Sequence, residues 1–221
     1  MLTTKSLFRF IISGLFFALA TSLSFTGVAA EMPKVAIHTN HGDITIELDA
    51  EKAPKTVANF LKYVNDGYYT DTIFHRVMSN FMIQGGGFTP KFERKATRAS
   101  ILNEADNGLS NVRGSIAMAR TSDPHSASAQ FFINVVDNNP LDHTSKTPRG
   151  YGYAVFGKVI KGMKVVDTIR AIPTGASGPF PMNVPKSAVI ISGMTHLNKT
   201  SKTDAAANTP KASPAPASEG N

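Results

Sequence analysis

The stretch Val35-Ala36-Ile37-His38-Thr39-Asn40-His41-Gly42-Asp43-Ile44-Thr45-Ile46-Glu47-Leu48 contains two apolar-rich runs on either side of Asn40-His41-Gly42. Apolar residues that alternate with polar ones are typical of β-strands buried on one face. A short connection that contains glycine is typical of the turn between two paired strands. We therefore expect this stretch to form a β-hairpin.

Two helical patterns lie outside this hairpin. The first begins near Pro54, ends near Gly67 and repeats apolar residues at i, i+3, i+4 and i+7, namely Val57, Phe60, Leu61 and Val64. This spacing behind an early proline predicts an amphipathic helix. The second pattern starts after Gly162 and contains Met163, Val166, Ile169 and Arg170. We expect a helix there as well.

The remaining apolar runs are short and are separated by Gly, Pro, Asn or Asp. They are Ile73–Val77, Phe81–Gln84, Ser115–Ala119, Phe131–Val135, Ala154–Ile160 and Ser187–Leu197. Runs of this length with turn residues between them are typical of β-strands. Many short strands with two helices predict a mainly β fold, either a closed barrel or a sandwich with helical caps.

Composition excludes several classes of protein. The chain has 221 residues, 42% of them hydrophobic and 18% charged, which is a globular composition with enough apolar residues for a core. It has no cysteine, and this excludes disulfides, cysteine-bound metals and a thiol nucleophile. The formal net charge is +7, but no basic stripe alternates with aromatic residues, so we expect no nucleic-acid binding.

The motifs of other enzyme classes are missing. The sequence has no Gly-x-Ser-x-Gly elbow, and Gly85-Gly86-Gly87 is not followed by the lysine of a phosphate-binding loop. His38 and His41 bracket the predicted turn, and no acid or third histidine stands at metal-ligand spacing. We therefore expect neither a metal nor a cofactor.

Residues 1–30 have the pattern of a secretory signal peptide. Lys5 and Arg9 precede an apolar stretch, and Val28-Ala29-Ala30 supplies small residues before Glu31. A retained membrane anchor is the alternative, because the wider apolar stretch approaches the length of a span. We expect cleavage before Glu31 and a folded domain over residues 31–198.

Residues 199–221 differ in composition from the rest of the chain. They consist mostly of Ala, Pro, Ser, Thr and Lys and contain no aromatic or large aliphatic residue. Such a segment buries too little apolar surface to offset its ordering entropy. We expect a disordered tail, and a role in tethering is the alternative.

The centre of the chain carries an ordered set of motifs. They are Phe74-His75-Arg76-Val77, Phe81-Met82-Ile83-Gln84-Gly85-Gly86, Ala117-Met118-Ala119, Gln130-Phe131-Phe132-Ile133, Leu141-Asp142 and Val155-Phe156-Gly157-Lys158-Val159. In order and approximate spacing these motifs resemble the cyclophilin family of peptidyl-prolyl cis–trans isomerases, over essentially all of residues 34–197. The resemblance is greatest to the exported bacterial branch.

The resemblance implies a closed eight-stranded antiparallel β-barrel capped by two α-helices. It implies an enzyme that accelerates isomerisation of X-Pro bonds during folding of exported proteins, without a metal or cofactor. The position of Arg76 matches the family's catalytic arginine, and Gln84 and Gln130 match polar positions that orient this arginine and the peptide. His75 is expected to be structural, because adjacent residues of a strand face opposite sides and His75 therefore points away from the side of Arg76.

Further site residues follow from the same resemblance. The matches to the family's proline pocket are Phe81, Met82, Phe132 and Leu141. Phe131 and Phe132 are adjacent in a predicted strand and therefore face opposite sides, with Phe132 toward the groove. Ala119 and Arg120 match the segment that binds the substrate peptide as an added strand, and only the backbone of Arg120 is expected to matter.

The sequence departs from the family at two groove positions. Pro140 stands where many members have a tryptophan, and Tyr153 replaces a histidine. We therefore expect weak binding of the inhibitor cyclosporin. The expected partners are proline-containing segments of unfolded or partly folded envelope proteins in the periplasm, bound by a monomer. Two other functions stay open: a cyclophilin-like chaperone or binding module with little catalysis, and an unrelated β-barrel that binds small molecules in a deep cavity.

Overall fold

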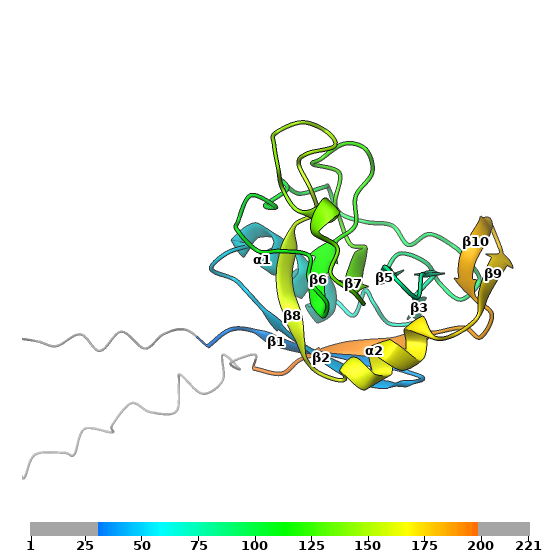
Figure 1. Ribbon diagram of the computed structural model, residues 1–221. Helices are drawn as coiled ribbons and strands as arrows, with labels where there is room; N and C mark the ends of the chain where they lie inside the picture. Colours follow the sequence, from blue (N-terminus) through cyan, green and yellow to red (C-terminus); the bar gives the residue numbers. More distant parts are fainter. Residues whose placement is uncertain (1–30, 199–221) are drawn as a thin grey trace, which may run out of the picture. The chain divides into compact units, whose positions relative to one another are not determined.

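The computed structural model describes residues 31–198 and shows a mainly β fold with two α-helices (Figure 1). The predicted signal peptide and tail lie outside the described residues. The strands are β1 (Lys34–Thr39), β2 (Gly42–Leu48), β3 (Thr72–Ile73), β4 (Arg76–Val77), β5 (Met82–Gly85), β6 (Ser115–Met118), β7 (Phe131–Asn134), β8 (Val155–Lys161), β9 (Thr174–Ser177), β10 (Phe180–Pro185) and β11 (Ile190–His196). The helices are α1 (Pro54–Asn65), α2 (Met163–Arg170) and a single 3-10 turn, η1 (Asn139–Leu141).

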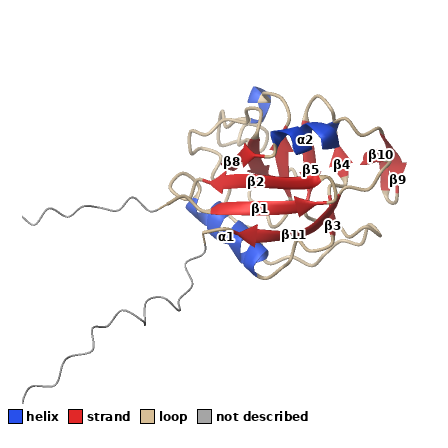
Figure 2. Cartoon of the chain, turned by 90° about the horizontal axis from the view of Figure 1, so that it is seen from below, coloured by secondary structure: helices blue, strands red, loops and turns tan. Residues whose placement is uncertain are grey.

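The predicted hairpin is confirmed as β1 and β2. The two strands are antiparallel and pair from Lys34 with Glu47 to Thr39 with Gly42, so Asn40 and His41 form the connection. Buried residues alternate along β2, where Ile44, Ile46 and Leu48 point into the core, whereas β1 buries the consecutive residues Val35, Ala36 and Ile37. This hairpin lies inside a curled antiparallel sheet of the order β3-β11-β1-β2-β8-β6-β7-β5-β4 (Figure 2).

Both predicted helices are confirmed. Helix α1 begins at Pro54, and Ala53 at its N-cap has no side chain that could accept a hydrogen bond. Glu104, from a distant loop, takes this role, because its carboxylate accepts hydrogen bonds from the Lys55 N–H at 3.1 Å and the Thr56 N–H at 2.8 Å. A carboxylate at this end also interacts favourably with the helix dipole. Helix α2 begins after Gly162, whose φ of +94° is a left-handed conformation that suits glycine.

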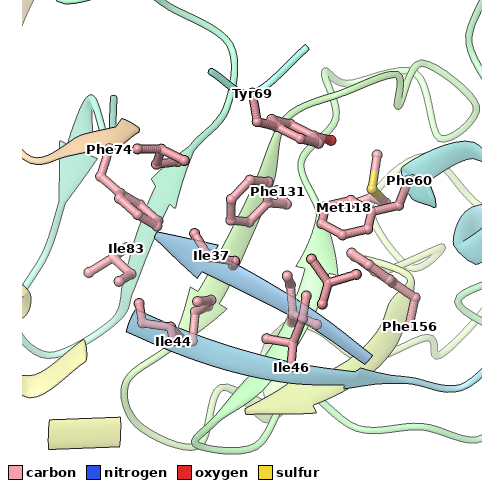
Figure 3. Close-up of a cluster of buried hydrophobic side chains, with 14 of the residues drawn as sticks. Ile37, Ile44, Ile46, Phe60, Tyr69, Phe74, Ile83, Met118, Phe131 and Phe156 are labelled. Carbon is pink, nitrogen blue, oxygen red and sulfur yellow. The ribbon is translucent and has the colours of Figure 1, made fainter. Parts of the chain in front are cut away.

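The main core fills the space enclosed by the curled sheet and α1 (Figure 3). Phe60 of α1 packs against Phe131 at 5.8 Å and Phe156 at 5.1 Å between ring centroids. These rings are fully buried. Tyr69 is buried beside them, and its hydroxyl donates to the Ala129 carbonyl at 2.8 Å, which satisfies its polar end.

Two parts of the chain differ from the expected elements. The run Ile73–Val77 was expected as one strand, but Phe74 and His75 interrupt it and leave the two-residue strands β3 and β4. The sequence analysis also missed the β9–β10 hairpin, because its residues contain Gly and Pro and lack a clear alternation of apolar residues. The hairpin forms a separate two-stranded sheet that contacts β4 (Figure 2).

The break between β3 and β4 places His75 in an aromatic environment. Its ring lies 4.7 Å from Phe88 and 5.3 Å from Phe180 of β10, measured between centroids. The side chain is buried, and its Nδ1 has no hydrogen-bond partner in the described part of the chain. Burial, and to a smaller extent the charge of Arg76, lower the pKa of His75 to about 4. His75 therefore packs as a neutral aromatic residue, as expected for a structural role.

We predict that His75 makes folding stability depend on pH. The unfolded chain takes up a proton at His75 near pH 6.5, whereas the folded protein does so only near pH 4. The contribution of neutral, buried His75 to the free energy of unfolding is therefore fully present above pH 6.5. It is lost as the pH falls toward 4, and the free energy of unfolding drops by about 2 to 3 kcal/mol between about pH 7 and 4.5. Urea unfolding at the two pH values should show this loss in the wild type and in the exposed-site control His38→Gln. The loss of unfolding free energy should be much smaller in His75→Phe. An equal loss in that variant would contradict the assignment of this pH dependence to His75.

Candidate functional site

A pocket of about 80 Å³ opens on the outer side of the sheet, and we call it the Arg76 pocket. Its lining residues are Arg76, Phe81, Met82, Gln84, Ala119, Arg120, Phe132, Leu141 and Tyr153. Every residue that the sequence analysis placed in the site lies here except Gln130. The residues come from β4, β5, β7, η1 and the segments that follow β6 and precede β8.

Strand register places the central residues of this pocket in a row. Arg76 of β4 is paired with Gln84 of β5, and Gln84 is paired with Phe132 of β7. Directly opposed residues on neighbouring strands point to the same face of a sheet. A polar donor, an amide and an aromatic ring therefore lie side by side, although they are far apart in the sequence.

The guanidinium of Arg76 is held by two acceptors. Its Nη1 donates to Gln84 Oε1 at 3.3 Å, and its Nη2 donates to Met78 Sδ at 3.3 Å. Gln84 Nε2 in turn donates to Gln130 Oε1 at 3.0 Å, which turns the Gln84 carbonyl toward Arg76. Gln130 therefore acts on Arg76 through Gln84. Met78 follows directly after β4 and was not among the predicted site residues, although residues two positions apart in extended chain point to the same side.

The floor of the pocket is an apolar cluster separate from the main core. Its buried members are Met82, Ala117, Phe132 and Val155. The adjacent Phe131 lies in the main core instead, so the prediction that the two phenylalanines face opposite sides is confirmed. Tyr153 stands edge-on to Phe132, with ring centroids 5.6 Å apart, and forms one wall.

A buried asparagine network, which the sequence analysis missed, supports the rim of the pocket. Asn138 Nδ2 donates to the Phe81 carbonyl at 2.8 Å and to Asn134 Oδ1 at 2.7 Å. Asn134 Nδ2 donates to Asn111 Oδ1 at 3.2 Å, and Asn111 Nδ2 donates to the Leu141 carbonyl at 3.2 Å. Phe81 and Leu141 are thus connected through three amides. Single polar residues in a sequence do not reveal such a network, because its members meet only in the folded protein.

The side chain of Arg120 makes contacts that the sequence analysis did not expect. Its Nε donates to the Gly152 carbonyl at 2.8 Å, and its Nη2 donates to the Pro148 carbonyl at 3.1 Å. Its guanidinium also lies 4.6 Å from the centroid of the Tyr153 ring, a cation–π arrangement. The side chain thus fastens the loop before β8 and holds the Tyr153 wall, a structural role in addition to the backbone contact with the peptide expected from the sequence.

Gln130 lies in a second pocket of about 140 Å³ next to the first, which we call the Gln130 pocket. The two pockets share Gln84, Ala119 and Arg120, and the Gln130 pocket is also lined by Arg94, Thr121, Ser126 and Ser128. The Ala119 N–H donates to the Gln130 carbonyl at 2.9 Å, which fixes the end of β6 at the boundary between the pockets.

The lining determines which chemistry the Arg76 pocket can support. It contains no carboxylate, histidine, lysine, serine or threonine, so it has no candidate for a side-chain nucleophile paired with a base. In residues 31–198, no three His, Asp or Glu side chains are placed to bind a metal ion, and no helix is long and apolar enough to span a membrane. The pocket offers an apolar hollow with an oriented cationic donor at its edge.

Comparisons with known proteins agree with this geometry. The family model for cyclophilin type peptidyl-prolyl cis-trans isomerase/CLD matches residues 34–196. Peptidyl-prolyl cis-trans isomerase B of Escherichia coli is 56% identical over 161 residues, which are 73% of this chain and 98% of that protein. Peptidyl-prolyl cis-trans isomerase cyp18 of Streptomyces antibioticus is 59% identical over 160 residues, 72% of this chain and 96% of that protein.

A solved structure also resembles this fold. The crystal structure of a cyclophilin type peptidyl-prolyl cis-trans isomerase of Cryptosporidium parvum, determined in the presence of the dipeptide Ala-Pro, superimposes with a TM-score of 0.63 at 30% identity. The match covers 75% of this chain and 99% of that chain. With the family match over the whole described domain and curated relatives above 50% identity, the chain belongs to the cyclophilin-type peptidyl-prolyl cis–trans isomerases and catalyses the isomerisation of X-Pro bonds.

Proposed function

We propose that Arg76 accelerates this reaction by hydrogen bonding to the prolyl nitrogen of a twisted X-Pro bond. The uncatalysed bond turns over a barrier of about 18–20 kcal/mol, because rotation breaks the conjugation of the nitrogen lone pair with the carbonyl. At the twisted state this nitrogen becomes a better hydrogen-bond acceptor. A donor that forms a hydrogen bond to this nitrogen only in the twisted state lowers the barrier without any covalent step.

The geometry around Arg76 supports this role. Its guanidinium stays charged at all relevant pH values and has a rigid set of donors. Gln84 and Met78 hold it, and no carboxylate in the lining of the pocket competes for its donors. The observation that carries the proposal is this held, unneutralised guanidinium at the edge of an apolar hollow.

We infer that the proline ring occupies the hollow and that the rest of the peptide is held through its backbone. Phe132 and Met82 are almost fully buried and form an apolar floor, and Phe81 and Leu141 form part of the rim. On one side of the proline, the peptide runs as an added strand along Ala119 and Arg120, toward the Gln130 pocket. Recognition through the backbone implies loose preference for the client sequence.

We also infer that the curled sheet closes into the barrel expected from the resemblance. Strands β3 and β4 stand at opposite ends of the pairing order but are joined only by Phe74 and His75. The Ile73 N–H donates to the Phe88 carbonyl at 3.0 Å, and the Gly86 N–H donates to the Ile73 carbonyl at 3.3 Å. These bonds link β3 to the chain that follows β5, which supports closure.

We predict that Arg76→Ala lowers kcat/KM by about 100-fold or more, the size of effect found when a donor to a transition state is removed. The affinity for a trans-proline peptide should change little, because the donor is used mainly in the twisted state. NMR exchange spectroscopy on a short proline peptide measures the rate, and peptide titration measures the affinity. Lys164→Ala, an exposed cation on α2, is the control. If Arg76→Ala kept the wild-type isomerisation rate, the proposed mechanism would be wrong. If the peptide isomerised no faster with the wild-type protein than in buffer alone, the binding-module alternative would hold.

We propose that the protein acts in the periplasm on unfolded or partly folded envelope proteins. The support is the pattern of residues 1–30, with Lys5 and Arg9 before an apolar stretch and Val28-Ala29-Ala30 before Glu31. Sequencing of the mature protein from a periplasmic extract should begin at Glu31. Recovery of an uncleaved chain with the membrane fraction would instead support the anchor alternative.

We further propose that the protein binds cyclosporin weakly. Pro140 and Tyr153 stand at positions where the family resemblance expects a tryptophan and a histidine, so an indole contact and its N–H donor are missing. Pro140→Trp should therefore strengthen cyclosporin binding by about 10-fold, if a large aromatic contact contributes about 1.5 kcal/mol. Calorimetric titration would measure this, and an unchanged dissociation constant would contradict the explanation.

A further inference from the structure

A groove of about 440 Å³ lies beside the Arg76 pocket, and we call it the Asn183 groove. Its lining comes from the turn that joins β4 to β5, the end of α2 and the β9–β10 hairpin. Figure 2 shows where these elements lie in the fold. Its lining residues are Val77, Met78, Ser79, Asn80, Phe81, Arg170, Ala171, Ile172, Pro173, Thr174 and Asn183. Neither the family resemblance nor the comparisons assign a role to this groove.

The groove is continuous with the site already described. Phe81 lines both spaces, and Met78 lines the groove while its sulfur accepts the hydrogen bond from Arg76. The Gln130 pocket shares Gln84 with the Arg76 pocket, and Gln84 lies three positions after Phe81 along an extended chain, a distance of roughly 10 Å. The Asn183 groove and the Gln130 pocket therefore flank the Arg76 pocket at its two ends.

The chemistry of the groove suits a polypeptide backbone. Its polar side chains are hydroxyls, amides and the guanidinium of Arg170, and neither a carboxylate nor a lysine lines it. The amides of Asn80 and Asn183 make no hydrogen bond to another residue within 31–198. Each amide can both donate and accept, as a peptide group requires, and Phe81 and Pro173 add apolar surface.

The backbone of the hairpin directs Asn183 into this space. Its φ is +65°, a left-handed conformation that few residues other than glycine adopt, although asparagine tolerates it. The pairing of β10 with β9 also shifts register between Phe180 and Val184, so Asn183 lies in an irregular part of the ladder. Such irregularities often redirect a side chain near a binding site.

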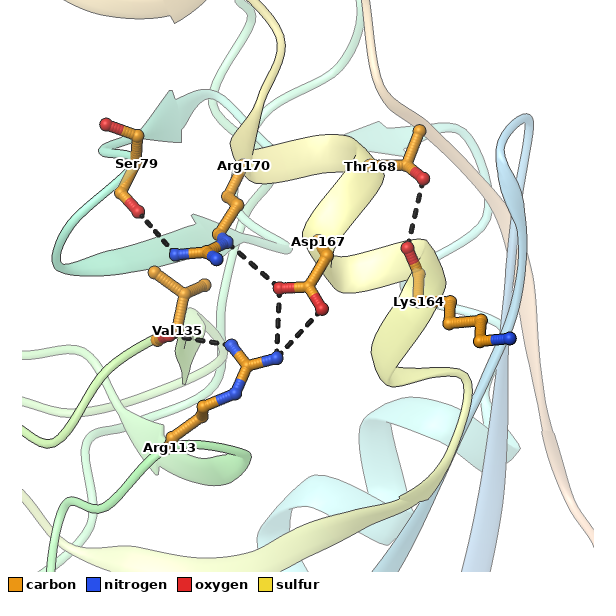
Figure 4. Close-up of polar contacts among 7 residues, drawn as sticks. All are labelled: Ser79, Arg113, Val135, Lys164, Asp167, Thr168 and Arg170. Carbon is orange, nitrogen blue, oxygen red and sulfur yellow. Dashed lines mark hydrogen bonds and ion pairs between the residues drawn. The ribbon is translucent and has the colours of Figure 1, made fainter.

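The opposite wall is fixed by an ion-pair network (Figure 4). Arg170 donates from Nη1 to the Ser79 carbonyl at 3.1 Å and from Nε to Asp167 at 2.9 Å. Asp167 also accepts two hydrogen bonds from Arg113 Nη2, at 3.0 and 2.8 Å. These arginines lower the pKa of Asp167, the hydrogen bond from Arg113 being the largest cause. The turn that carries Phe81 is thereby tied to α2, and Arg170 shares the carboxylate of Asp167 with Arg113.

We propose that the Asn183 groove binds the segment of the client polypeptide that leaves the Arg76 pocket on the side away from Ala119. This rests on the proposed path of the peptide. Isomerisation moves that segment, because one side of the X-Pro bond must turn while the other is held. The groove is several times larger than the Arg76 pocket and therefore has room for the segment in both isomers. Its unpaired amides bind the segment through backbone groups.

Peptides of different length test the proposal in the wild type. A short capped X-Pro peptide is compared with versions extended by four residues at the N-terminal or the C-terminal end. Extension at one end should raise kcat/KM by about fivefold, as expected for one or two hydrogen bonds. A spin label at that end should broaden the NMR signals of the Asn80 and Asn183 side-chain amides. If neither extension raised the rate, or the label broadened only signals of the Gln130 pocket, the proposal would be wrong.

Two variants test the residues themselves. Asn183→Gly removes the amide and keeps the left-handed backbone without strain, and Asn80→Ala removes the other amide. Both should reduce the rate ratio of extended to short peptide toward one. Met182→Ala is the matched control, because Met182 is exposed on the same hairpin and does not line the groove. A preserved ratio in both variants would overturn the proposal. The rate on the short peptide reports separately whether the isomerase mechanism is intact.

Discussion

Two adjacent phenylalanines on β7 connect the stability of this fold to its function. Phe131 points into the main core, where Phe60 and Tyr69 pack against its ring, and Phe132 points outward and forms the floor of the Arg76 pocket. The alternation of side chains along a strand makes this arrangement unavoidable. A shift of register by one residue would exchange the two rings, and both the core and the pocket would be lost. The packing of the core therefore also fixes the position of the Arg76 pocket.

The polar part of the site depends on the same register. The pairing of β4 with β5 places Gln84 opposite Arg76, and Gln130 then holds the orientation of Gln84. The guanidinium remains partly exposed but is not neutralised by a carboxylate of the pocket. The guanidinium of Arg120 differs, because its donors are occupied by carbonyls of the loop before β8, and its position over the Tyr153 ring holds that side chain. Arg76 is thereby left without a carboxylate partner in the pocket, as its proposed role requires, and Arg120 stabilises the wall.

Much of this structure could be predicted from local patterns and ordered motifs. The β1–β2 hairpin and both helices follow from periodicity, and nine of the ten site residues proposed from the sequence line the Arg76 pocket. What was missed depends on contacts between distant segments. Glu104 caps α1 from a separate loop, the asparagine network joins three segments, and the conformation of Asn183 arises from a register shift. Such features involve single polar residues, and polar residues alone carry no periodic signal.

The sizes of the three spaces are consistent with the motion that the reaction requires. An X-Pro bond can turn only if the catalyst holds one side and leaves the other free to move. In the proposed complex the small Arg76 pocket encloses the proline ring, and the peptide segment along Ala119 lies against a strand end that is fixed by the hydrogen bond from the Ala119 N–H to the Gln130 carbonyl. The Asn183 groove is wider, and its free amides can exchange one backbone partner for another. Tight binding on both sides would stabilise the planar ground states as much as the twisted state and would not accelerate rotation. A tight Arg76 pocket beside the wider, polar Asn183 groove suits an enzyme that binds both the cis and the trans isomer and stabilises the twisted state between them.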